Sequence, residues 1–203
     1  MRSEAPALLP IFRSQLQAEV LTSLLLHPEQ EHSLSELAAQ MDAPLSTLHR
    51  EVGRLVEAGL LTARSHGRNR LVRADMSHPA APALAALLEI VFGPKPVIRE
   101  EFSSLEAEFV AIFGSWAARY EGSPGPPPND IDVLVVGDVE RLSVYDAADR
   151  AQARLGFKVN PVVFSRARWF DTEDLLASQV RSSATVTVIP EREVVHDGAL
   201  AQR

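Results

Sequence analysis

The stretch SLSELAAQMDAPLSTLHREVGRLVEAGLL, residues 33–61, determines the fold of the N-terminal third of the chain. It holds two amphipathic segments separated by a turn at residues 42–44. Ser33 and Glu36 have the spacing of a capping box, which predicts the start of the first helix. Apolar residues in the second segment recur at the spacing of one buried helix face: Leu45, Leu48, Val52 and Leu55. Gly59 follows where a helix needs a left-handed residue, so this stretch predicts two helices joined by a tight turn.

The sequence on both sides of this stretch completes a small domain. Leucines at helical spacing predict a helix over residues 11–27. Behind the stretch, residues 60–64 and 70–74 are rich in strand-forming side chains and flank a glycine-containing loop at residues 65–69. Three helices followed by a hairpin therefore predict a first domain over residues 1–75.

The charges single out one basic segment in an acidic protein. The 203 residues carry a net charge of −7, which speaks against a general binder of polyanions. Residues 46–73 nevertheless hold six arginines and two glutamates, a net charge of +4. Only two of the 20 basic residues in the chain are lysines, so nearly every cation is a guanidinium fork suited to phosphate or guanine.

The helices and the basic hairpin together resemble the winged helix-turn-helix of bacterial transcription regulators of the ArsR and MarR type, over residues 11–75. The resemblance implies that the helix over residues 45–58 is a recognition helix for double-stranded DNA and that the hairpin is a wing. With the leucines turned inward, the residues expected to face DNA are Ser46, Thr47, His49, Arg50 and Arg54 on the helix and Arg64, His66, Arg68, Asn69 and Arg70 on the wing. Pro44 departs from the family, where a serine often caps this helix, so Asp42 or Ser46 is expected to supply the cap. The alternative is a helical domain for protein contacts whose arginine face is merely solvated.

Residues 76–104 form a connector between two domains. Breaks rich in proline flank two apolar segments, which predict helices over residues 83–92 and 97–105. Such helices either pair two subunits of a homodimer or pack on the second domain, and the sequence leaves both open.

The composition excludes several classes of site. Cysteine is absent, which excludes disulfides, thiolate metal sites and a cysteine nucleophile and is compatible with a reducing cytoplasm. The six histidines are scattered and form no pair of the kind that metal-sensing ArsR proteins use. We expect no apolar run near the roughly 18–20 residues that cross a bilayer, and no signal peptide, so the predicted location is the cytoplasm without a membrane partner.

The remainder of the chain, residues 105–203, has the alternating pattern of an α/β domain. Strands are expected over residues 108–113, 130–136 and 157–164, and helices over residues 116–120, 143–155 and 167–180. The fold class predicted for the whole chain is therefore α/β (α+β), with a small mixed sheet in the second domain.

Two motifs in this domain, FGSWAARY at residues 113–120 and NDIDVLVVGD at residues 129–138, resemble the minimal nucleotidyltransferase domain of the DNA polymerase beta superfamily. Side chains alternate along a strand, so Asp130 and Asp132 share a face about 7 Å apart. Carboxylates at that spacing can bind Mg²⁺, or Mn²⁺, bridging a nucleoside triphosphate. Gly114 and Ser115 are expected to approach its phosphates, and Arg119 either joins them or is solvated. The alternative is that the two aspartates only mark the start of a buried strand.

The third carboxylate of active family members, on the next strand, is replaced here by Asn160. Asparagine orients a metal weakly and cannot act as a base, so Asp130, Asp132 and Asn160 predict nucleotide binding with little turnover. Asp171 or Glu173 close to the pair would instead favour an active enzyme. The leading hypothesis is thus a DNA-binding transcriptional regulator with a nucleotide-sensing second domain. The alternatives are a nucleotidyltransferase that modifies protein, RNA or a small molecule, and a component of a toxin–antitoxin pair.

Overall fold

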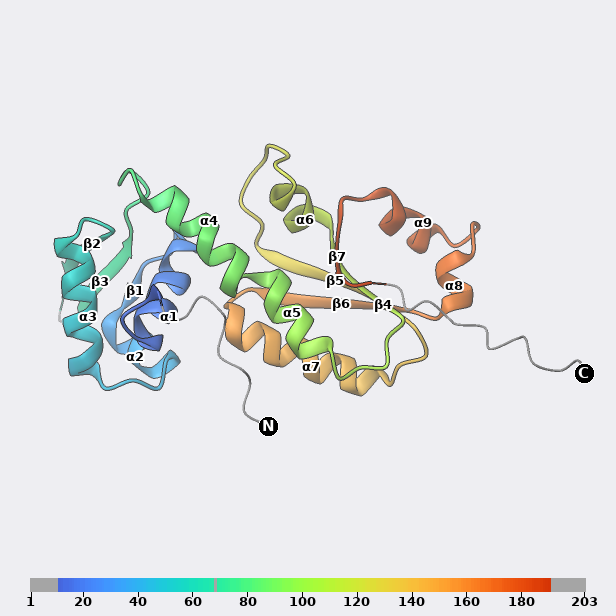
Figure 1. Cartoon of the computed structure of the whole chain (residues 1–203), viewed down its shortest axis with the longest axis horizontal. Coiled ribbons are helices and arrows are strands. Elements are labelled where there is room, and N and C mark those ends of the chain that lie inside the picture. Colours follow the sequence, from blue (N-terminus) through green and yellow to red (C-terminus); the bar gives the residue numbers. More distant parts are fainter. Residues whose placement is uncertain (1–10, 68, 191–203) are drawn as a thin grey trace, which may run out of the picture. The chain divides into compact units, whose positions relative to one another are not determined.

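The computed structural model describes residues 11–67 and 69–190, and the chain folds as two compact units, Met1–Pro96 and Val97–Arg203 (Figure 1). The boundary falls inside the segment that the sequence assigns to a connector. The fold is α+β, as predicted: a helical unit with a small sheet is followed by a separate unit with a mixed sheet.

The first unit contains helices packed beside a small antiparallel sheet (Figure 1). Its elements are α1 (Gln15–Leu25), β1 (His32–Ser33), α2 (Leu34–Gln40), α3 (Leu45–Glu57), β2 (Leu61–His66), β3 (Asn69–Ala74) and α4 (Ala81–Phe92). The strand order is β1-β3-β2, and β1 was not expected from the sequence because two residues show no periodicity. The elements follow the predicted order of three helices and a hairpin.

Local chemistry explains where α2 and α3 begin and end. The Ser33 hydroxyl accepts a hydrogen bond from the Glu36 amide, and the Glu36 carboxylate accepts one from the Ser33 amide, which confirms the capping box. Gly59 has a φ of +77°, as its place after α3 requires. The predicted side-chain cap of α3 is wrong, because neither Asp42 nor Ser46 caps it. The Pro44 carbonyl accepts hydrogen bonds from the Thr47 and Leu48 amides.

The core of the first unit joins α1, α2, α3 and α4 to the hairpin, and α3 contributes Leu48, Val52 and Leu55. The expectation that Leu45 belongs to this face is wrong, because its side chain is 49% exposed in the first turn of α3. Glu51 instead completes the inward stripe and is only 7% exposed. The prediction from apolar spacing considered only apolar residues and so did not include this carboxylate.

The hairpin, which we call the wing (residues 61–74), is longer and turns more tightly than expected. His66 pairs with Asn69, so the loop is only two residues long and Gly67 takes a φ of +60°. The predicted five-residue loop at 65–69 is therefore wrong, because polar side chains extend both strands beyond the apolar part.

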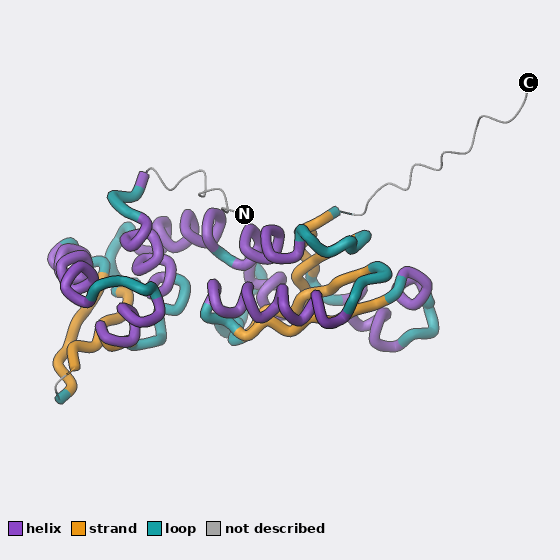
Figure 2. The backbone as a smooth tube through the Cα atoms, turned by 90° about the horizontal axis from the view of Figure 1, so that it is seen from below, coloured by secondary structure: helices purple, strands orange, loops and turns teal. Residues whose placement is uncertain are grey.

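The second unit is built on a four-stranded mixed sheet in the order β6-β5-β4-β7. After α5 (Pro94–Phe102), its elements are β4 (Phe109–Phe113), α6 (Gly114–Tyr120), β5 (Asp130–Val136), α7 (Arg141–Leu155), β6 (Lys158–Phe164), α8 (Arg166–Phe170), α9 (Leu175–Ser182) and β7 (Thr185–Ile189). β5 and β6 are parallel and joined through α7, whereas β4 is antiparallel to both β5 and β7. Figure 2, with strands in orange, shows helices covering this sheet.

The two faces of the sheet have different covers. Ile131 and Val133 of β5 belong to the larger core, which includes side chains of α5, α6 and α7. Leu134 and Phe164 face the other way, into a smaller core with Ala177 and Val180 of α9. The predicted helix over 167–180 is wrong, because a break after Phe170 divides it into α8 and α9.

One helical segment of the described residues, Ala81–Phe102, is long and apolar enough to cross a membrane by length and composition alone, so the expectation of no such run is wrong. The segment is not one uninterrupted helix, because α4 ends at Phe92, Gly93 follows as its C-cap, and α5 begins at Pro94. Leu88, Ile98 and Phe102 are fully buried in protein cores, which is a sufficient reason for their apolar character.

Candidate nucleic-acid interface and carboxylate site

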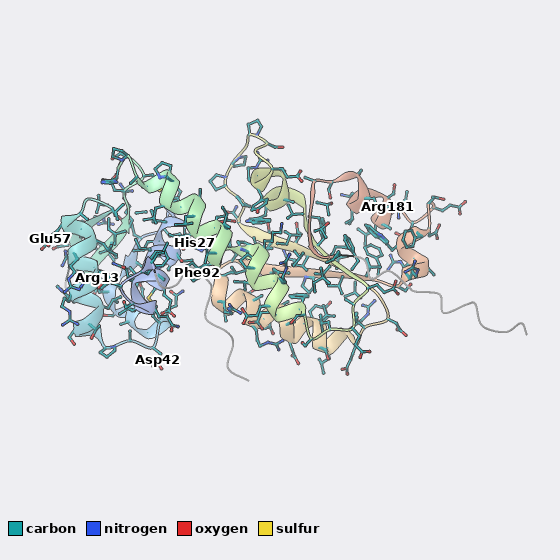
Figure 3. The ribbon with its side chains drawn as sticks, in the orientation of Figure 1. Arg13, His27, Asp42, Glu57, Phe92 and Arg181 are labelled. Atoms are coloured by element: carbon teal, nitrogen blue, oxygen red, sulfur yellow. The ribbon has the colours of Figure 1, made fainter. Side chains whose placement is uncertain are left out.

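The outer face of α3 carries the side chains that the sequence predicts to contact DNA. Ser46, His49, Arg50 and Arg54 are exposed, and Thr47 is half-buried. Figure 3 labels residues near the two ends of this segment, Asp42 in the turn before α3 and Glu57 in its last turn. Within residues 11–67 and 69–190, no carboxylate forms an ion pair with Arg50. A helix with one buried stripe and an exposed arginine face has the amphipathic form of a recognition helix.

Arg54 is held in place from beneath by the buried Glu51. The Glu51 Oε2 lies 3.3 Å from Arg54 Nη1, and Glu51 Oε1 accepts a hydrogen bond of 2.8 Å from Gln17 Nε2 of α1. The carboxylate therefore links α1 to α3 and anchors the base of an exposed guanidinium. Sequence reasoning missed Glu51, and its position among apolar neighbours of α3 was the available sign.

The wing distributes its polar side chains over two faces. Residues opposite each other in an antiparallel pair share a face, so Arg64 with Leu71 and His66 with Asn69 lie on one side. Arg70, opposite Ser65, lies on the other side, where it lines a hollow of about 300 Å³ together with Val56 of α3. Arg68, which is also predicted to contact DNA, lies outside the described residues.

Glu31, just before β1, makes a forked contact with Arg64 that the sequence did not suggest. Arg64 Nε donates to Glu31 Oε1 over 2.8 Å, and Arg64 Nη2 donates to Glu31 Oε2. The hydrogen bonds from Arg64 lower the pKa of Glu31. The guanidinium of Arg64, a residue predicted to contact DNA, is thus already bound to a carboxylate.

In the second unit, β5 and β6 bring three predicted site residues together. Asp130 and Asp132 are half-buried on one face of β5, and Asn160 lies opposite Asp132 on β6. Asn160 Nδ2 donates to Asp130 Oδ2 over 2.9 Å and to Asp132 Oδ1 over 3.3 Å. One amide nitrogen therefore lies between the two carboxylates. Pro161 lies in β6, which is an edge strand, and edge strands are where proline is tolerated in a sheet.

The surroundings of Asp132 favour its neutral form. Burial raises the pKa of Asp132 most, and the charge of Asp130 raises it further. The hydrogen bond from Asn160 and the charge of Lys158 act in the opposite direction, and the net pKa stays above the ordinary value. A cation between the carboxylates would favour the charged form.

Gly114 lies directly against this pair. It has a φ of +78°, and a side chain there would place its Cβ 3.0 Å from Asp132 Oδ2. Its amide donates to the Ala184 carbonyl over 3.0 Å, which connects the start of α6 to β7. Ser115 follows and is exposed. The positive φ thus favours glycine beside Asp132, and a side chain there would also press on the carboxylate.

The described contacts of the Arg119 side chain are with the Gly/Pro loop rather than with the carboxylates. Arg119 Nη1 donates to the Ser123 carbonyl over 2.5 Å, and a Cβ on Gly125 would lie 2.4 Å from the same guanidinium nitrogen. The Nε of Arg119 is buried without a hydrogen-bond partner among the described residues. Its contact with phosphate stays a prediction.

No third carboxylate joins the pair in the part of the chain that the structure describes. Asp171 and Glu173 are exposed in the segment between α8 and α9, where Asp171 Oδ1 accepts from the Glu173 amide over 2.9 Å. Among residues 11–67 and 69–190, no three Asp, Glu, His or Cys side chains cluster as a metal site. The candidate ligands are therefore two carboxylates and one amide.

Residues 16–64 match the family described as helix-turn-helix domain. No curated protein matches the chain. Similar solved structures include reduced HlyU from Vibrio cholerae N16961, at 20% identity over 41% of this chain and 79% of that one, with a TM-score of 0.33. Another is the transcriptional regulator BldR from Sulfolobus solfataricus, at 20% identity over 46% of this chain and 63% of that one, with a TM-score of 0.35. The family match places in this chain, at residues 16–64, a helix-turn-helix domain of the kind with which transcriptional regulators bind DNA.

Proposed function

We propose that this protein is a cytoplasmic transcriptional regulator that inserts α3 into the major groove of double-stranded DNA. The observation that carries the proposal is the exposed arginine face of α3 within a matched helix-turn-helix domain. Arg50 is free of acidic partners among the described residues, so its fork can contact the O6 and N7 atoms of guanine. Arg70, on the wing face beside Val56, serves as a contact to the phosphate backbone.

We propose further that the protein acts as a homodimer. One helix-turn-helix domain contacts a short half-site, and two copies give a useful length of specific sequence. α4 supports this proposal, because Ile90 is 64% exposed although its neighbours Leu88 and Phe92 are packed in the core. α1 packs against α4, and the ring of Phe12, just before α1, lies 5.9 Å from that of Phe92.

For the second unit we propose a site for a divalent metal and a nucleoside triphosphate that works as a sensor. The donor set fits a hard cation, because two carboxylates converge on one position and Asn160 can offer Oδ1 in place of Nδ2. Bound Mg²⁺ or Mn²⁺ would supply neutralisation of the triphosphate charge. Asp130, Asp132 and Asn160 would hold the ion, and Gly114 leaves space for a close approach beside Asp132. An amide in place of a third carboxylate provides no base, which favours binding over transfer.

The DNA-binding proposal is tested by selecting duplexes from a random pool with the full-length protein. A dimer with α3 as the reading element is expected to enrich one pseudo-palindromic sequence with half-sites about one helical turn apart. Enrichment of a single half-site would reject the dimer, and no enrichment at all would reject sequence-specific binding.

The nucleotide proposal is tested by thermal unfolding with Mg²⁺ and each nucleoside triphosphate in turn. A ligand at one hundred times its dissociation constant stabilises the folded state by about 2.7 kcal/mol, which produces a measurable rise in Tm. The double variant Asp130→Asn/Asp132→Asn should lose the rise. Labelled nucleotide that becomes covalently attached to protein or RNA with the wild type alone would replace the sensor by an active transferase.

A further inference from the structure

The contact between Glu31 and Arg64 ties up a wing cation that would otherwise be open to DNA. Both Oε atoms of Glu31 accept hydrogen bonds from Arg64, from Nε and from Nη2. This is the bidentate arrangement with which a guanidinium binds a phosphate group. Arg64 therefore cannot make the same bidentate contact with a phosphate while its guanidinium is bound to Glu31.

Glu31 lies beside the face of the wing that carries Arg64 and Arg73, and its charge affects the electrostatic potential of that face. Arg64 and Arg73 lie on one face of the hairpin, as their partners Leu71 and Thr62 show, and they line a hollow of about 400 Å³ with Glu31. Arg73 and His66 are close enough to Glu31 to interact with it electrostatically. A negative charge amid three basic side chains weakens the attraction of this face for a polyanion.

The pair is exposed enough to exchange partners. The side chain of Arg64 is 54% exposed and that of Glu31 is 30% exposed, so water reaches both. Ion pairs in such surroundings are weak and are screened by salt. By contrast, the partner of Arg54 is the buried Glu51, which cannot move away without leaving its charge uncompensated.

We propose that Glu31 is a built-in competitor of DNA: the wing gains Arg64 as a phosphate contact only when a phosphate displaces this carboxylate. The inference rests on the proposed DNA binding and adds a residue that limits it. Glu31 lowers the affinity for every sequence, so stable binding depends more strongly on the base contacts of α3. The carboxylate thus reduces the contribution of phosphate contacts to the affinity and increases the relative contribution of base contacts.

The test is fluorescence anisotropy with the full-length protein and a labelled mixed-sequence DNA duplex over a series of salt concentrations. Glu31→Gln keeps the size of the side chain and removes its charge. It should tighten binding by about two- to fivefold, the range that an exposed ion pair allows. The plot of log affinity against log salt should become steeper by up to about 0.9, the effect of one further phosphate contact.

Two controls separate this role from general charge. Glu29→Gln makes the same change of charge in the same segment, at an exposed residue outside the contact with Arg64, and should leave affinity near that of the wild type. Arg64→Ala should abolish the gain, so that Glu31→Gln/Arg64→Ala binds no more tightly than Arg64→Ala. Circular dichroism verifies that each variant is folded.

Each outcome decides the proposal. Equal gains from Glu29→Gln and Glu31→Gln, an unchanged affinity of Glu31→Gln, or a gain that persists without Arg64 would each overturn it while leaving DNA binding intact. Failure of the wild type and all variants to bind DNA would reject the proposed function, and this inference with it.

Discussion

Glu51 is a buried carboxylate that contacts both α1 and a predicted DNA-binding arginine. Its carboxylate accepts from Gln17 of α1 on one side and lies against Arg54 on the other. A charged group at 7% exposure is tolerable only because both oxygens have partners. The residue therefore connects α1 to α3 and holds an exposed arginine that we propose to contact DNA.

Replacing Glu51 by alanine should destabilise the protein by about 1–3 kcal/mol, because the half-buried Gln17 amide would lose its acceptor. Glu51→Gln should cost less, since an amide oxygen still accepts from Gln17. Glu57→Ala, at an exposed position of α3, is the matched control and should change stability little. Urea unfolding measures all three variants, and a loss for Glu57→Ala as large as that for Glu51→Ala would contradict the assignment.

The carboxylate pair predicts a dependence of stability on pH. Burial first, and then the charge of Asp130, hold the pKa of Asp132 above its ordinary value. A raised pKa in the folded state contributes stability below the ordinary carboxyl pKa, and this contribution is lost as the pH rises through the folded-state value. Asp132→Asn, which keeps an oxygen for Asn160, should therefore gain Tm relative to the wild type at neutral pH and lose this advantage in acid.

Thermal melts of both proteins across a pH series measure this difference. The exposed Asp138→Asn is a control for the loss of one negative charge. A rise in Tm for Asp132→Asn that is the same at every pH would show that the raised pKa of Asp132 does not reduce stability at neutral pH. Added Mg²⁺ should stabilise the wild type at neutral pH and leave Asp132→Asn nearly unchanged, since the ion requires both carboxylates.

The helix and the wing should respond differently to the loss of an arginine. Arg54→Ala on α3 should cost about 1–3 kcal/mol on the selected duplex and relax specificity at one base pair, if its fork contacts guanine. Arg70→Ala on the wing should weaken all sequences to a similar degree and reduce the salt dependence by about one phosphate. Affinity measured on the selected duplex and on single-base variants separates the two cases, and an identical pattern for both variants would contradict the division of roles.

Elements with strong periodicity could be predicted from the sequence, whereas elements defined by long-range pairing could not. The capping box at Ser33 and the apolar stripe of α3 act within a few residues, so the sequence alone predicts α2 and α3 closely. β1 and β7 exist because distant strands β3 and β4 pair with them, which no local pattern encodes. The break between α8 and α9 escaped prediction because Asp174 caps a new helix inside a segment that looked continuous.

The same distinction holds for the candidate sites. Strand alternation placed Asp130 and Asp132 on one face, and the resemblance to nucleotidyltransferases placed Asn160 beside them, where it donates to both carboxylates. The partners of Arg54 and Arg64 could not be predicted, because Glu51 is in contact with α1 and Glu31 precedes a strand that the sequence did not reveal. The arginines themselves can be identified from the sequence, whereas their carboxylate partners are determined by the tertiary structure.

For the whole molecule, a sensor role requires that nucleotide binding to the second unit change the free energy of DNA binding by the first unit. A nucleotide that changes the affinity for DNA by some factor must have its own affinity changed by DNA by the same factor, typically about 5–150-fold. Anisotropy with and without Mg²⁺ and nucleotide gives the first factor, and calorimetry with and without the selected duplex gives the second. Nucleotide binding that leaves the affinity for DNA unchanged would contradict the sensor and leave two independent sites.

The central claim, that α3 binds DNA as the reading element of a regulator, is tested most directly by the affinity of Arg50→Ala for the selected duplex over a range of salt. The logarithm of the wild-type affinity should fall linearly with log salt, with a slope of about −0.9 for each phosphate contacted. Arg50→Ala should lose about 1–3 kcal/mol on the selected duplex and little on a mixed-sequence duplex. Arg141→Ala, an exposed arginine of the second unit, removes the same charge and should behave like the wild type. Affinity that is insensitive to salt, or a loss for Arg141→Ala equal to that for Arg50→Ala, would contradict the account.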